Sequence, residues 1–214
     1  MKQVVTNDDI RSLGTILGVW AHPDDESFTC AGIMAAAIEN GQTVICITAT
    51  RGEAGVQDES RWPPSQLGEI RAAELADALR ILGVKHHHWL GYPDGGCADV
   101  NPKDAVEKIK QLIDRYSPDT ILTFGPDGMT GHPDHQTVSK WASLAAEGED
   151  ISVYHVVENK NTYEKYLKKA DEQFNIYFNI DQPPLREKRE CDIGFCLNHE
   201  HVRKKFTALA AMPS

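Results

Sequence analysis

Apolar runs typical of buried strands alternate along the chain with segments of helical periodicity. Strands are expected over residues 15–21, 43–48, 84–90 and 120–124, and helices over residues 28–39, 67–82, 103–116 and 132–146. Strands that alternate with helices form a mostly parallel sheet with helices packed on both of its faces. Nearly unbroken apolar strands agree with this arrangement, because such strands are buried on both sides. The sequence therefore predicts an α/β fold.

The later part of the chain is expected to continue this pattern. Two further strands are expected over residues 151–157 and 174–180, and a largely helical segment over residues 183–211. No linker rich in proline, glycine or serine divides the sequence. Since 214 residues are enough for one well-buried domain and short for two, we expect a single domain over residues 1–214.

Composition excludes several classes of protein. With 41% hydrophobic and 25% charged residues, the chain is unlike a disordered protein. A net charge of −10 without a basic stripe argues against nucleic acid as a partner. The longest apolar run, residues 31–38, is shorter than the roughly 18 residues of a membrane helix, and residues 1–9 turn acidic before a signal peptide could form its core. We therefore expect a cytoplasmic protein without a membrane partner.

One tripeptide, His-Pro-Asp, occurs twice, each time after an expected strand. The two copies lie in His22-Pro23-Asp24-Asp25-Glu26 and in His132-Pro133-Asp134-His135. In a parallel α/β sheet, ligands bind beyond the carboxyl ends of the strands. Each copy holds a pair of possible metal ligands three residues apart, His22 with Asp25 and His132 with His135. On a helix, a pair at this spacing points to one side.

Two histidines and one carboxylate that leave a position for water are a common catalytic zinc site. The five cysteines add no competing site, because they are odd in number and share no Cys-x-x-Cys spacing. The competing interpretation is that His22 and His132 only begin helices, with nearby carboxylates facing the helix dipoles. Two copies of the motif at two expected strand ends favour the metal site.

Other candidate motifs carry less weight. The turn after the first expected strand lacks the Gly-x-Gly-x-x-Gly of dinucleotide sites, and no Gly-x-x-x-x-Gly-Lys-Ser/Thr loop is present. The three successive histidines His86-His87-His88 cannot converge on one ion from a strand, because neighbouring side chains point to opposite faces.

The two His-Pro-Asp motifs resemble those of the PIG-L/LmbE-like family of zinc-dependent N-acetylglucosaminyl deacetylases. The resemblance covers about residues 15–145 in order, and it continues through Gly52-Glu53-Ala54-Gly55, Arg71-Ala72-Ala73-Glu74-Leu75 and Pro93-Asp94-Gly95. It implies a Rossmann-like three-layer α/β/α sandwich, one Zn²⁺ per chain and hydrolysis of an N-acetyl group on a glucosamine-type sugar. One departure is Thr130, where some members carry a tyrosine that reaches the developing oxyanion.

The resemblance also implies roles for individual residues. Asp24 matches the general base, and His132 matches the general acid. Asp134 is expected to orient His132 and to raise its pKa. The positions that match the zinc ligands are His22, Asp25 and His135.

Arg71 and Asp94 match positions that bind the substrate in this family. For Arg71, the competing interpretation is a surface ion pair with Glu69 or Glu74, which would add little stability. For Asp94, it is a plain turn, since Pro-Asp-Gly suits a turn without any function. Both interpretations stay open for each residue at this point.

We therefore expect a metal-dependent hydrolase that removes an N-acetyl group from an N-acetylglucosamine-type sugar or glycoconjugate. The expected partner is this small acetylated amino sugar, and a homo-oligomer is compatible with the sequence. Two alternatives stay open, namely an amidase on a thiol-conjugate amide of the mycothiol or bacillithiol type, and a silent module that binds a sugar or a metal. The intact Asp24 and His132 argue against the silent module, because a binder needs neither a base nor an acid.

Overall fold

Five parallel strands form the central sheet of the computed structural model, which describes residues 6–55 and 58–214. Their order across the sheet is β3–β2–β1–β4–β5. The strands are β1 (Ile16–Trp20), β2 (Val44–Thr48), β3 (His86–Trp89), β4 (Thr120–Phe124) and β5 (Ser152–Val156). β1 is central, since Ile16 is in register with Val44 on one side and with Thr120 on the other. The expected parallel sheet is confirmed.

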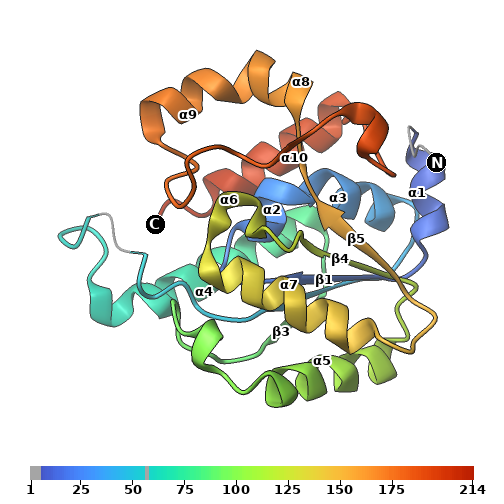
Figure 1. Cartoon of the computed structure of the whole chain (residues 1–214), viewed down its shortest axis with the longest axis horizontal. Coiled ribbons are helices and arrows are strands. Elements are labelled where there is room, and N and C mark those ends of the chain that lie inside the picture. The colour runs from blue at the N-terminus through green and yellow to red at the C-terminus, as the bar shows by residue number, and fades with distance from the viewer. Residues whose placement is uncertain (1–5, 56–57) are drawn as a thin grey trace.

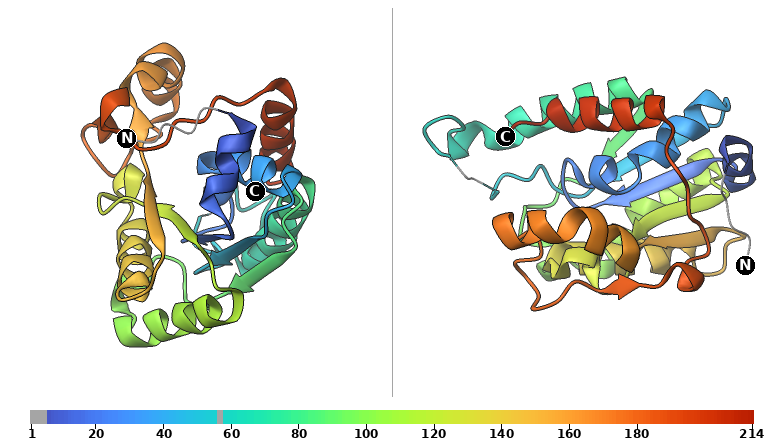
Figure 2. Two further views of the ribbon diagram at one scale, coloured as in Figure 1. Left: turned by 90° about the vertical axis from the view of Figure 1, so that its right-hand side faces the viewer. Right: turned by 90° about the horizontal axis from the view of Figure 1, so that it is seen from above.

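Helices cover both faces of this sheet (Figures 1 and 2). On one face, α10 (His199–Ala210) packs against α3 (Ala31–Glu39) and α4 (Pro64–Leu82). On the opposite face, α5 (Pro102–Tyr116) packs against α7 (Pro133–Ala146). The three-layer α/β/α fold is therefore confirmed. Within the described ranges, every helix is too short or too polar to span a bilayer.

Short elements connect and flank these layers. They are α1 (Asn7–Ile10), η1 (Arg11–Leu13), α2 (Asp25–Thr29), η2 (Cys97–Asp99), α6 (Gly128–Gly131), β6 (Glu158–Asn159), α8 (Lys160–Thr162), the π-helix η3 (Tyr163–Leu167), α9 (Lys168–Phe174), β7 (Leu185–Arg186) and η4 (Lys188–Glu190). Residues 1–5, part of the segment on which the expectation about a signal peptide rests, lie outside the described residues.

Local sequence accounts for the bounds of the main elements. α5 begins at Pro102, where the side chain of Asn101 accepts a hydrogen bond from the backbone of Lys103. α4 ends at Gly83, whose φ of +86° is a left-handed conformation that glycine adopts at no steric cost. The three central strands β1, β2 and β4 are buried along their whole length, so they form the core between the two helical layers.

Two expectations for the C-terminal part are wrong. No strand forms over residues 174–180: Phe174 ends α9, Asn175 takes a left-handed conformation, and residues 176–180 form turns in which Phe178 is exposed. Of residues 183–211, α10 and the short η4 are helical. The two prolines that open this segment lack a backbone N–H, and the chain continues through β7.

The expected helix over residues 28–39 is divided at Cys30 into α2 and α3.

Replacing Ile47, which is fully buried in β2, should test the central core. We expect Ile47→Ala to lower the free energy of unfolding by about 2–5 kcal/mol, because it removes buried methyl groups and leaves a cavity. Phe206→Ala is the control, since this side chain is 65% exposed on α10 and its loss should cost less than about 0.5 kcal/mol. Urea unfolding followed by circular dichroism measures both, and equal losses would contradict the placement of β2.

Candidate metal centre

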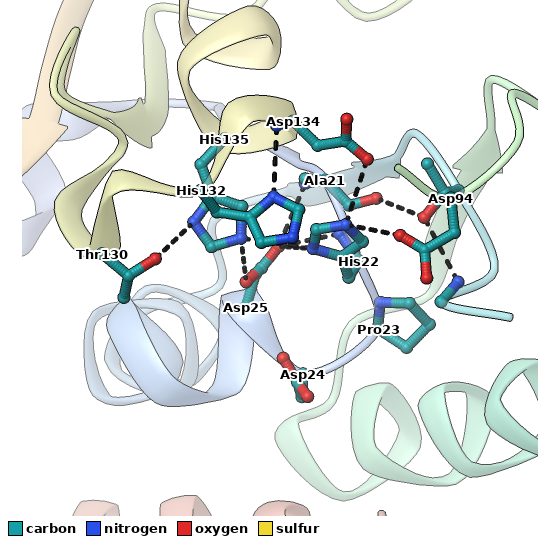
Figure 3. A network of polar contacts seen from close by, with 12 residues as sticks. Ala21, His22, Pro23, Asp24, Asp25, Asp94, Thr130, His132, Asp134 and His135 are labelled. Carbon is teal, nitrogen blue, oxygen red and sulfur yellow. Dashed lines mark hydrogen bonds and ion pairs between the residues drawn. The ribbon is translucent and has the colours of Figure 1, made fainter. Parts of the chain in front are cut away.

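The two His-Pro-Asp motifs meet at the carboxyl edge of the sheet (Figure 3). β1 and β4 are neighbours, but the chain leaves β1 toward β2 and leaves β4 toward β5. The two connections therefore diverge, and a ligand-binding crevice is expected at this point of such a sheet. His22 follows β1, and His135 lies in the first turn of α7, 113 residues away in the sequence.

Candidate ligand atoms of three side chains face one another in this crevice. His22 Nδ1 lies 3.2 Å from His135 Nε2, His135 Nε2 lies 3.3 Å from Asp25 Oδ1, and His22 Nδ1 lies 3.7 Å from Asp25 Oδ2. Zinc bonds of about 2.0–2.2 Å in a tetrahedron place neighbouring ligand atoms about 3.3–3.6 Å apart. The spacing therefore fits one divalent cation bound by these three side chains.

Hydrogen bonds on the far side of each ring select the nitrogen that is left for a cation. His135 Nδ1 lies 3.0 Å from the carbonyl oxygen of Gly128, so it donates its hydrogen there and leaves Nε2 with a lone pair. His22 Nε2 lies 3.0 Å from Asp94 Oδ1 and 3.3 Å from Asp134 Oδ2, so it donates to a carboxylate and leaves Nδ1 with a lone pair. Two lone pairs and a carboxylate thus point at the same position, which suits a cation.

The start of each helix places these ligands. Asp25 is the first residue of α2, and its Oδ2 accepts the backbone N–H groups of Ala21 at 3.1 Å and of His22 at 2.7 Å. His132 is the N-cap of α7, and its Nδ1 accepts the backbone N–H of Asp134 at 3.2 Å. The competing interpretation, that these residues begin helices, is therefore true of His132 and is compatible with the metal site.

The buried charges favour a positive charge at the centre of the site. Burial alone would lower the pKa of His22, but its hydrogen bonds to Asp134 and Asp94 outweigh burial and raise the pKa to about 10. Burial would raise the pKa of Asp25, yet the neighbouring His135 and His22 bring it below its usual value. A proton or a divalent cation between the rings supplies the positive charge that these carboxylates favour.

An aromatic pair at the ends of β1 and β4 packs against the ring of His135. The ring of Phe124, at the end of β4, stacks on that of His135 with centroids 4.0 Å apart and 6° between the planes. Trp20, at the end of β1, meets Phe124 edge-on at 5.3 Å. Sequence analysis missed both supporting residues, and their position at the last residue of two neighbouring strands is the signal that could have found them.

Asp134 contacts a different histidine from the one expected. Its carboxylate faces Nε2 of His22, and it is the backbone N–H of Asp134 that reaches His132. α7 begins between the two residues and turns the carboxylate of Asp134 toward His22, so the role of Asp134 in orienting and charging the His132 ring stays a prediction. The pKa of His132 is lowered, first by burial and then by the nearby His22 and His135.

Asp94 is likewise engaged inside the protein. Its Oδ1 faces His22, its Oδ2 accepts the backbone N–H of Ala54 at 2.9 Å, and the side chain is 8% exposed. Both oxygens of Asp94 contact protein groups, and its expected substrate-binding role stays a prediction. The backbone N–H of Asp94 donates to Glu53 Oε1 at 3.0 Å, which gives Glu53 the loop-fixing position.

Arg71 holds the loop that carries Asp24. Its Nη2 donates to Asp24 Oδ2 at 2.9 Å and to the carbonyl oxygen of Pro23 at 3.0 Å, and its Nη1 donates to the carbonyl oxygen of Gly52 at 3.0 Å. The side chain is 12% exposed, so the surface ion pair with Glu69 is wrong. Arg71 therefore positions Asp24, and a direct contact of Arg71 with substrate stays a prediction.

Asp24 occupies a strained backbone position. Its φ of 100° lies where residues other than glycine are rare, and such strain concentrates at functional sites. Figure 3 shows its carboxylate set apart from the His22–Asp25–His135 group. Burial and the charge of Asp25 raise the pKa of Asp24 to about 7, while Arg71 opposes this shift. The role of Asp24 as the general base stays a prediction.

His132 lies beside the three candidate ligands. Its ring centroid is 4.7 Å from that of His22 and 4.9 Å from that of His135. Ligand atoms of these three histidines all lie within 4.8 Å of one another, so His132 is close enough to act on a group bound at the same position. Thr130, the departure from the family pattern, contacts the site through Oγ1, which lies 3.3 Å from His135 Nδ1.

Comparison with known proteins agrees with this geometry. The family profile of the GlcNAc-PI de-N-acetylases, named PIG-L, matches residues 17–146. This match covers more than half of the chain and contains both His-Pro-Asp motifs. The chain belongs to the PIG-L family.

Curated PIG-L relatives carry the name 1D-myo-inositol 2-acetamido-2-deoxy-α-D-glucopyranoside deacetylase. The protein from Saccharomonospora viridis is 34% identical over 154 residues, which are 62% of this chain and 58% of that one. The protein from Mycobacteroides abscessus is 38% identical over 150 residues, 60% of this chain and 54% of that one. The chain thus spans a little over half the length of these relatives.

Solved structures share the fold. The conserved protein TT1542 from Thermus thermophilus is 32% identical, with a TM-score of 0.53 over 66% of this chain and 65% of that one. The N,N'-diacetylchitobiose deacetylase from Pyrococcus horikoshii has a TM-score of 0.65 at 20% identity, over 95% of this chain and 71% of that one. A 4-carboxy-2-hydroxymuconate hydratase from Pseudomonas putida has a TM-score of 0.64 at 19% identity, over 94% of this chain and 79% of that one. The fold alone therefore does not decide the reaction.

His135→Ala should remove the bound metal, because His135 Nε2 is one corner of the ligand triangle. We expect metal analysis of the purified variant to fall from about one ion per chain to nearly none, with an unchanged far-ultraviolet circular dichroism spectrum. His86→Ala is the matched control, since this exposed histidine of β3 packs on Tyr116, away from the ligand triangle, and should leave the metal content unchanged. Wild-type metal content in His135→Ala would place the ion elsewhere.

The strain at Asp24 predicts an unusual order of stability. Asp24→Gly and Asp24→Ala both remove the carboxylate, but glycine takes a φ of 100° without steric cost. We expect the glycine variant to be more stable than the alanine variant by about 1 kcal/mol in urea unfolding. An alanine variant as stable as the glycine variant would show that the backbone at this position is unstrained.

Proposed function

We propose that this protein is a metal-dependent N-deacetylase that hydrolyses the acetamide group of an N-acetylglucosamine glycoside. The observation that carries the proposal is the convergence of His22 Nδ1, Asp25 and His135 Nε2 in a member of the PIG-L family. Zn²⁺ is the ion that we propose, because two imidazoles and one carboxylate with an open position suit it.

The chain's own groups can move the protons that this hydrolysis requires. His22, Asp25 and His135 would hold a divalent cation, which would supply Lewis acidity for the acetamide carbonyl and for a water molecule. Asp24 accepts the proton that the water loses as its oxygen bonds to the carbonyl carbon. His132 gives its Nε2 proton to the sugar nitrogen as the carbon–nitrogen bond breaks and regains a proton from the one that Asp24 took from water, so the products are acetate and a free amine.

Local hydrogen bonds support these roles of Asp24 and His132. Nδ1 of His132 accepts the backbone N–H of Asp134, so His132 exchanges protons at Nε2. Arg71 pairs with Asp24 and fixes the direction of its carboxylate. A silent binding module would need neither a directed His132 nor a directed Asp24. The strained backbone of Asp24 would then lower stability without serving a function.

The names of the relatives support a more specific substrate. They describe deacetylation of an acetamido sugar that is joined to myo-inositol. We propose a substrate of this kind, an N-acetylglucosamine linked to a polar cyclitol. These names favour the mycothiol-type alternative that the sequence left open over a simple N-acetylglucosamine sugar. The bond that is cleaved would be the carbon–nitrogen bond of the acetamide group.

Asp24→Asn should keep the metal and lose turnover, because asparagine cannot accept the proton from water. We expect kcat for acetate release from an acetylated glucosamine–inositol glycoside to fall by about 10²- to 10⁴-fold at unchanged metal content. Chelation of the metal from the wild-type protein should abolish the same activity, and added Zn²⁺ should restore it.

Glu69→Gln is the control for this experiment, since Glu69 is exposed and pairs with Arg51 at the surface. It should retain wild-type turnover. Near-normal acetate release by Asp24→Asn would remove Asp24 from the mechanism, and chelator-resistant activity would remove the metal.

A further inference from the structure

Nε2 of His22 faces two buried carboxylates at once. It lies 3.0 Å from Asp94 Oδ1 and 3.3 Å from Asp134 Oδ2, and these side chains are 8% and 0% exposed. A histidine that donates Nε2–H has one hydrogen to give, so the two carboxylates compete for it. One acceptor would be enough to orient the ring, and the second one requires an explanation.

We propose that Asp94 and Asp134 are paired positioning residues that share the Nε2–H of His22, so that either can keep Nδ1 directed at the metal. The proposal rests on the metal site of the proposed function and does not depend on the substrate. It is a different role from those that the sequence suggested for the two aspartates, namely substrate binding and orientation of His132.

The protein backbone fixes Asp134 in place for this role. Its Oδ2 accepts the backbone N–H of Gly95 at 2.8 Å, and its Oδ1 accepts that of Cys97 at 3.1 Å. Asp134 also precedes His135 in the first turn of α7. One helical turn therefore supplies a metal ligand and, from the adjacent residue, an acceptor that directs the other histidine.

Asp94 reaches the same hydrogen from a different part of the chain. It lies in the loop after β3, where its Oδ2 accepts the N–H of Ala54 and its own N–H donates to Glu53. The two carboxylates accept different backbone donors, Ala54 for Asp94 and Gly95 with Cys97 for Asp134, so removal of one side chain leaves the hydrogen bonds of the other in place. This independence is what a redundant pair requires.

Redundancy predicts a specific pattern of metal affinity. Loss of an outer partner of a metal-ligating histidine typically weakens metal binding by about 10- to 100-fold. We expect Asp94→Ala and Asp134→Ala each to weaken Zn²⁺ binding by no more than about 10-fold, because the remaining aspartate takes over the hydrogen. The double variant should then weaken binding by more than the product of the two single effects.

The experiment is Zn²⁺ competition against a chromophoric chelator, on the full chain, with Asp77→Ala as the matched control. Asp77 is an exposed acid of α4 that pairs with Arg80, and its removal should leave Zn²⁺ affinity unchanged. Nitrogen NMR of the zinc-loaded protein provides a second readout. The Nε2–H of His22 should exchange slowly with water in the wild type and in both single variants, and much faster in the double variant.

Several results would overturn the proposal. Wild-type Zn²⁺ affinity in the double variant would show that the carboxylates do not direct His22, and purely multiplicative single effects would show that they are not redundant. Ligand atoms of His22, Asp94 and Asp134 also lie within 4.8 Å of one another. Two ions per chain in the wild type, falling to one in the double variant, would make this group a second metal site.

Two further outcomes separate this proposal from the function. If Asp134→Ala does not fold, Asp94→Ala alone tests the proposal. The Nε2–H of His22 must still exchange slowly in that variant, because Asp134 is present, and fast exchange would overturn the proposal. If wild-type protein binds Zn²⁺ with the expected pattern but releases no acetate, the proposed function fails and the positioning pair stands.

Discussion

The close approach of two imidazole nitrogens is the constraint on which the rest of the site depends. His22 Nδ1 and His135 Nε2 lie 3.2 Å apart, and each has given its ring hydrogen to a partner on the far side. Lone pairs at this distance repel unless positive charge lies between them. The pairing of β1 with β4, the two helix starts and the outer hydrogen bonds all serve to hold these nitrogens face to face.

Burial of three carboxylates around these rings has a large electrostatic cost, and backbone N–H groups offset much of it. Asp25 accepts two of them from the turn after β1, Asp134 accepts two from the loop after β3, and Asp94 accepts one from the loop after β2. The loops at three strand ends are thus tied to the same buried cluster. The conformation of these loops and the geometry of the proposed metal ligands therefore depend on each other.

The sequence predicted all five strands of the sheet, β5 included, because apolar periodicity is a local property, and it predicted the meeting of the two motifs because ligand sites lie at the strand ends of such a sheet. It could not predict which ring Asp134 faces, since that depends on how α7 turns the side chain. The stacking of Phe124 on His135 also follows only from the pairing of strands in three dimensions. The strand predicted over residues 174–180 is absent for a related reason, because alternating apolar residues form a strand only where they can pair with the edge of a sheet.

Anomalous X-ray diffraction at the zinc edge, on crystals of the full chain grown with Zn²⁺, tests the central claim most directly. The account predicts one ion per chain, bonded to His22 Nδ1, Asp25 and His135 Nε2 at about 2.0–2.2 Å, with His22 Nε2 still facing the two outer aspartates. An ion bonded to Nε2 of His22, or an ion at any other position with the triangle of His22, Asp25 and His135 left empty, would contradict it.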